Sequence, residues 1–126
     1  MAKRVAEWAA RPGNEEFDGA LRYLSLQFSP ATARRLVSKA RRATRTEHVA
    51  KDILRACQLP LLPTDEKHVA ENLKKIRKGK SMAPIILVRG DLTAGRPLVI
   101  GDGYHRLCAA CHADEDTPVA ALLVSP

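Results

Sequence analysis

The chain has 126 residues, 45% of them hydrophobic and 28% charged, which is the composition of a globular protein large enough for one compact core. No apolar run approaches the roughly 20 residues of a transmembrane helix, and the basic first residues lack the apolar centre of a signal peptide, so a membrane partner is not expected. Three cysteines do not make a disulfide framework, and we therefore expect a reduced, cytoplasmic setting.

The net charge of +7 is concentrated in the first half of the chain. Residues 1–58 hold 12 Lys and Arg against 6 Asp and Glu, whereas residues 59–126 hold 9 against 8. Between Asp18 and Glu47 there are seven Lys and Arg and no acidic residue. A basic segment of this kind is either a solvated helix face or a surface for an acidic partner such as nucleic acid.

The first half of the chain is predicted to be helical, because its apolar residues recur at helical spacing. Ser29-Pro30 is a typical helix start, with serine as the N-cap and proline in the first turn. Thr44 and Glu47 have the spacing of a capping box, which predicts a further helix near them. The expected helices cover residues 3–10, 15–28, 30–42 and 46–57.

Residues 58–64 contain two prolines and mark a boundary, after which helical and strand-like segments alternate. We therefore predict an α+β fold in two parts, a helical N-terminal subdomain (1–58) and a small α/β module with a mixed sheet (59–126). The expected elements of the second part are a helix over residues 65–78, strands over 84–89, 97–100 and 119–124, and a helix that begins at Tyr104.

The segment from Pro97 to Cys111, PLVIGDGYHRLCAAC, predicts a buried strand that turns through two glycines into a helix. The first amides of a helix have no intrahelical partner and favour negative charge, and glycines let a ligand approach the backbone closely. An arginine in the first turn can grip two phosphate oxygens at once. This junction is therefore a candidate phosphate site, formed by Gly101, Gly103, Tyr104, His105 and Arg106.

Other interpretations of single residues stay open. Asp102 is either the N-cap of the helix, with the basic residues after it solvated, or a ligand of Mg²⁺ beside the phosphates. Lys80, in a loop before the strands, either closes over the phosphates or is solvated. Cys108 and Cys111 share the apolar stripe of the last helix, so we predict that they fill the core rather than bind a metal.

The order of elements and the sequence Asp102-Gly103-Tyr104-His105-Arg106 resemble the ParB/sulfiredoxin superfamily over residues 60–126. The turn is closest in form to the Asp-Gly-His-His-Arg of the free-serine kinases in that superfamily. Tyr104 stands where sulfiredoxin has its nucleophilic cysteine, so repair of sulfinic acid is not expected. The resemblance implies a bound nucleotide, a triphosphate or diphosphate such as ATP or CTP, whose phosphates lie on the helix N-terminus. It also implies Mg²⁺ at Asp102 and a catalytic acid, for which Glu66 or Asp65 is the candidate.

Two main hypotheses about function follow. The first is a nucleotide-binding protein, in the form of a small Mg²⁺-dependent phosphotransferase or NTPase in which Glu66 or Asp65 acts as the base. The alternative is a non-enzymatic DNA-associated or regulatory protein. A third hypothesis is a protein-interaction module with a vestigial nucleotide site. The sequence leaves open whether the protein forms a homodimer. The residues expected to contact nucleic acid in the alternative are Arg34, Arg35, Lys39, Arg41, Arg42 and Arg45.

Overall fold

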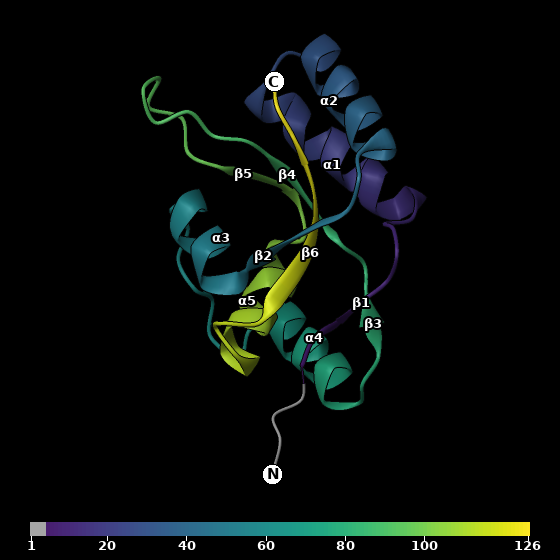
Figure 1. Cartoon of the computed structure of the whole chain (residues 1–126), viewed down its shortest axis with the longest axis vertical. Helices are drawn as coiled ribbons and strands as arrows, with labels where there is room; N and C mark the ends of the chain where they lie inside the picture. Colours follow the sequence, from purple (N-terminus) through teal and green to yellow (C-terminus); the bar gives the residue numbers. More distant parts are fainter. Residues whose placement is uncertain (1–4) are drawn as a thin grey trace.

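A four-stranded sheet lies at the centre of the molecule, between two layers of helices (Figure 1). The structure, a computed structural model, describes residues 5–126. The two inner strands of the sheet are parallel, and each outer strand is antiparallel to its neighbour. In spatial order the strands are β2 (Thr46–Val49), β6 (Pro118–Val124), β4 (Ile85–Val88) and β5 (Val99–Asp102).

The helices cover both faces of this sheet. On one face lie α1 (Asn14–Gln27) and α2 (Pro30–Arg42), and on the other lie α3 (Ala50–Cys57) and α5 (Tyr104–Ala113). The remaining helix, α4 (Lys67–Arg77), packs against α5. A short parallel pair, β1 (Glu7–Trp8) and β3 (Ser81–Met82), lies beside α4 at the lower end of the view in Figure 1. The predicted α+β class is confirmed.

The two central strands are apolar on both faces, which explains their uninterrupted hydrophobic sequences. Alternate side chains of a strand point to opposite faces of the sheet. Those that pack against α1 and α2 are Ile86, Val88, Leu122 and Val124. Those that pack against α3 and α5 are Ile85, Leu87, Val119 and Ala121.

Residues of both predicted parts build this sheet and its core. The strand β2 comes from residues 1–58, yet it pairs along its whole length with β6. The helices α1 and α2 also come from the first part, and they bury their apolar faces on strands of the second. Arg11 fixes the end of α2, because its guanidinium donates to the carbonyl oxygens of Ala40, Arg41 and Ala43.

Most predicted elements are confirmed, and the start of α2 is a clear case. The amide of Thr32 donates to the Ser29 hydroxyl oxygen at 3.2 Å, so Ser29 is the N-cap, and Pro30 occupies the first turn. The helices expected around residues 15–28 and 65–78 are present as α1 and α4. No helix within residues 5–126 is long and apolar enough to span a membrane.

Two predicted helices are wrong in whole or in part. The helix expected over residues 46–57 begins only at Ala50, because residues 46–49 form β2 and hydrogen-bond to β6 instead of making a capped helical turn. A helix was expected over residues 3–10; its first two residues lie outside the described part of the chain. The rest is extended and includes β1, which pairs with β3.

The layered core makes a direct prediction about Leu122, which is fully buried between the sheet and the layer of α1 and α2. Leu122→Ala is expected to lower the free energy of unfolding by about 2–5 kcal/mol, because it removes buried methyl groups and leaves a cavity. Leu92→Ala is the matched control, since Leu92 is 87% exposed and its truncation should cost less than about 0.5 kcal/mol. Urea denaturation measures both, and similar losses in the two variants would contradict the assigned core.

Candidate functional site

The turn between β5 and α5 depends on two glycines that are closely packed by the protein itself. Gly103 is the N-cap of α5 and has φ +112°, a backbone conformation that side chains rarely allow. A Cβ atom there would lie 2.4 Å from Cγ2 of Ile85. A Cβ atom on Gly101 would lie 3.3 Å from Cδ1 of Leu24, on α1. The glycines therefore allow strand, turn and helix to meet beside a cavity described below.

Asp102 and Arg106 form an ion pair across this turn. A guanidinium nitrogen of Arg106 lies 2.9 Å from a carboxylate oxygen of Asp102, and the side chains are only 17% and 23% exposed. The same guanidinium donates to the carbonyl oxygen of Pro84, and its Nε is buried without a partner. Asp102 makes no capping bond to α5, so its interpretation as the N-cap is wrong: the N-cap is Gly103, and the Asp102 carboxylate pairs with Arg106.

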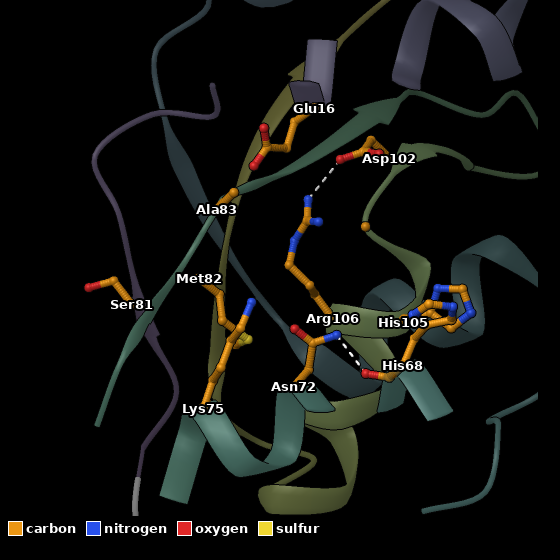
Figure 2. A pocket seen from close by; sticks show the side chains of 11 residues that line it. Glu16, His68, Asn72, Lys75, Ser81, Met82, Ala83, Asp102, His105 and Arg106 are labelled. Atoms are coloured by element: carbon orange, nitrogen blue, oxygen red, sulfur yellow. Dashed lines mark hydrogen bonds and ion pairs between the residues drawn. The ribbon is translucent and has the colours of Figure 1, made fainter. Parts of the chain in front are cut away.

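The pKa of Asp102 is affected by its partly buried position. Loss of hydration raises the pKa of its carboxyl above the usual value, and this outweighs the opposing attraction of Arg106. The carboxylate of Glu16 raises the pKa of Asp102 further. Figure 2 shows the Arg106 guanidinium pointing toward Asp102, with Glu16 on the same side of the cavity. Asp102 of β5 and Glu16 of α1 thus line the same cavity as Arg106.

A cavity of about 570 Å³ opens beside this turn, between α4 and β5 (Figure 2). We call it the turn cavity. Its cationic and imidazole groups come from two helices, and the amine of Lys75 points into it from α4. Its acidic groups come from α1 and β5. The titratable residues that line it are Glu16, His68, Lys75, Asp102, His105 and Arg106.

Two histidines stand at the rim of the turn cavity. The ring centroids of His68 and His105 are 4.9 Å apart, and Nε2 of His105 lies 3.8 Å from a carboxylate oxygen of Glu66. Glu66 itself caps α4, because its carboxylate accepts a hydrogen bond from the amide of Val69 at 2.8 Å. That hydrogen bond lowers the pKa of Glu66, so at neutral pH it is a weaker base than an ordinary glutamate. Asp65 is exposed and does not line the cavity.

The structure brings together some of the predicted site residues and separates others. Asp102, Gly103, His105 and Arg106 line the turn cavity, whereas Lys80 does not. Gly101 and Tyr104 face a second cavity, of about 470 Å³, on the other side of the turn. The Tyr104 hydroxyl also donates to the carbonyl oxygen of Pro60 and so ties the segment 58–64 to α5.

Five polar residues of the turn cavity were missed by the sequence reasoning, and one of them, Ser81, lies on β3. His68, Asn72 and Lys75 come from α4, and their spacing of four and three residues places them on one helix face. That spacing is visible in the sequence, but it becomes informative only once α4 is known to pack beside α5. Glu16 lies 86 positions before Asp102, and nothing in the sequence connects the two.

The three cysteines are core residues, as predicted for Cys108 and Cys111. All three are buried free thiols. Burial raises the pKa of each thiol, that of Cys111 to about 11, so each stays protonated at neutral pH. Among residues 5–126 there is no group of three or more His, Cys, Asp or Glu side chains arranged to hold a metal ion.

No protein-family model, no curated protein and no solved structure matches the chain. The resemblance to the ParB/sulfiredoxin superfamily therefore stays a prediction. The protein is an α+β protein with a cavity at a strand–helix turn. A fold does not determine a function, so the chemistry of the residues that line this cavity is the best guide to what it binds.

Gly103→Ala tests the packing of the turn. The new methyl group would meet Ile85 and force a strained backbone, and we expect a loss of about 2–5 kcal/mol in the free energy of unfolding. Gly95→Ala is the control, because Gly95 also has a positive φ, of +71°, but has no atom within 4 Å of the new Cβ position. The control should lose only about 1–2 kcal/mol from backbone strain. If urea denaturation shows equal losses in the free energy of unfolding for the two variants, Gly103 is not packed closely against Ile85.

Proposed function

We propose that this protein binds the phosphate groups of a nucleotide in the turn cavity. The observation that carries the proposal is the convergence of basic groups from two helices on one cavity at a helix N-terminus. His68 and Lys75 approach from α4, while His105 and Arg106 approach from α5. The first amides of α5 and the dipole of the helix favour an anion at the same place.

Each of these groups has a distinct part in holding an anion. Lys75 offers a mobile point charge, because its amine points into the cavity and has few constraints. Arg106 offers a planar guanidinium that can bind two oxygens, but it is paired with Asp102. A phosphate therefore binds best when it replaces the Asp102 carboxylate as the partner of the Arg106 guanidinium. The side chain of Asn72 also lines the cavity and adds a neutral polar group, and its Nδ2 donates to the carbonyl oxygen of His68 within α4 (Figure 2).

The carboxylates of the cavity fit a nucleotide that carries Mg²⁺. Glu16 and Asp102 would repel bare phosphates, since both line the same cavity. Magnesium is commonly bound by one or two carboxylates together with substrate phosphates, and these two residues provide that number. When bound, the ion would neutralise charge between the carboxylates and the phosphates. We therefore keep Mg²⁺ at Asp102 in the proposal and add Glu16 as its second carboxylate.

Binding has more support than catalysis. Glu66 is engaged as the cap of α4, its pKa is lowered, and it is not among the residues that line the cavity. Asp65, the other candidate base, is exposed and is not among the lining residues either. Phosphotransfer or NTP hydrolysis would need a base at the phosphates, so it stays a prediction from the sequence resemblance alone.

Titration calorimetry with ATP, CTP and inorganic pyrophosphate, each with and without Mg²⁺, tests the proposal. We expect binding of at least the nucleotides, and Lys75→Ala should weaken it about tenfold, because one charged contact is removed. Lys80→Ala is the matched control, since Lys80 is an exposed lysine five residues away that does not line the cavity. Absence of binding by the wild-type protein, or equal effects of the two substitutions, would overturn the proposal.

A further inference from the structure

The outer side of α2 carries a second, separate concentration of positive charge. The helix buries Ala33, Leu36, Val37 and Ala40 against the sheet. Arg35, Lys39 and Arg42 follow one another at intervals of four and three residues, so they lie on one side of the helix, away from most of this buried stripe. Arg34 is also exposed. In Figure 1 α2 lies at the opposite end of the molecule from α4, so this surface is distinct from the turn cavity.

The fold adds a further arginine to this surface. The Lys39 amine donates to the carbonyl oxygen of Ser125, and Nε of Arg89 donates to the Ser125 hydroxyl oxygen. Arg89 directly follows β4, so it is 50 positions from Lys39 in the sequence but shares a hydrogen-bonding partner with it. We define the basic face as Arg35, Lys39, Arg42 and Arg89.

Two of the basic residues predicted to contact nucleic acid, Arg41 and Arg45, contact other parts of the fold, and we leave them out of the basic face. The Arg45 guanidinium is partly buried and donates to the carbonyl oxygens of Trp8 and Ala9. Arg41 donates to the side chain of Asn14, and its guanidinium lies 4.5 Å from the centre of the Phe17 ring. The charges left for a partner are those of the basic face and of Arg34.

The charges of the basic face are not neutralised by ion pairs within the described part of the chain. None of the ion pairs found among residues 5–126 involves a residue of α2, or Arg89. The sequence from residue 19 to residue 46 contains no aspartate or glutamate. Clustered like charges repel one another, so a folded surface of this kind is best stabilised by a polyanion.

We infer that the basic face binds the sugar–phosphate backbone of double-stranded nucleic acid. The helix is about 20 Å long, which is enough to follow several phosphates of a duplex. It contains no aromatic residue on which an unpaired base could stack, which disfavours single strands. It also contains no Asn or Gln, the side chains that pair bidentately with adenine. Its lysine and arginines provide the charges that bind phosphates. The inference does not depend on the turn cavity.

Fluorescence anisotropy with a labelled 20-base-pair duplex of mixed sequence tests this inference. Four charged contacts predict that the logarithm of the association constant falls with the logarithm of salt with a slope of about −3.6. The affinity should then drop roughly 100-fold between 50 and 200 mM salt. The double substitution Arg35→Glu with Arg42→Glu should weaken binding about 30-fold or more at the lower salt concentration.

The matched control is Lys74→Glu with Arg77→Glu, which makes the same change of charge on exposed residues of α4. It should change duplex affinity less than about threefold, because these residues lie away from the basic face. Circular dichroism verifies the fold of both variants. Absence of duplex binding at 50 mM salt, or equal loss in both variants, would overturn the inference. Binding of poly-glutamate as tight as that of the duplex, and equally sensitive to Arg35→Glu with Arg42→Glu, would overturn it in favour of an acidic protein partner.

Discussion

The ion pair between Asp102 and Arg106 is the interaction on which the turn depends. It connects the last residue of β5 to the first turn of α5, and the guanidinium also reaches the carbonyl oxygen of Pro84 at the start of β4. Both side chains are largely withdrawn from water, so removal of either partner leaves a poorly hydrated charge. The pair therefore fixes the shape of the turn and, with it, one wall of the turn cavity.

The same ion pair also determines how readily an anion can bind to Arg106. A guanidinium that is already satisfied by a carboxylate offers little to a phosphate, and the carboxylate itself repels one. The cavity has other positive groups, above all Lys75, and an anion that enters beside them competes with Asp102 for Arg106. Glu16 adds a second carboxylate, which is why a cation bound with the ligand suits this cavity. Phosphate binding is thus an exchange of partners rather than the filling of a vacant arginine site.

Local sequence signals were sufficient for the parts of the fold that local interactions decide. Ser29-Pro30 marks the start of α2 because the cap is formed within one turn, and Gly103 marks the turn because its backbone has a positive φ. The strand β2 could not be predicted in this way. Its residues match a helical pattern, but they hydrogen-bond to β6, about 70 positions later, and this pairing overrides the local preference. The same difference holds for the candidate site. Arg106 could be predicted from the local sequence around the turn, whereas Glu16 and Lys75 reach the cavity only because α1 and α4 pack beside that turn.

In the proposed exchange of partners, Asp102 restrains Arg106 and competes with phosphate for it. The most direct test is the affinity for pyrophosphate, without Mg²⁺, of the wild-type protein, of Asp102→Asn and of Asp102→Asn combined with Arg106→Gln. We expect Asp102→Asn to bind pyrophosphate about tenfold more tightly, because the arginine is released and a repelling charge is lost, and we expect the second substitution to abolish this gain. A folded Asp102→Asn protein that binds pyrophosphate no more tightly than the wild type would contradict the claim.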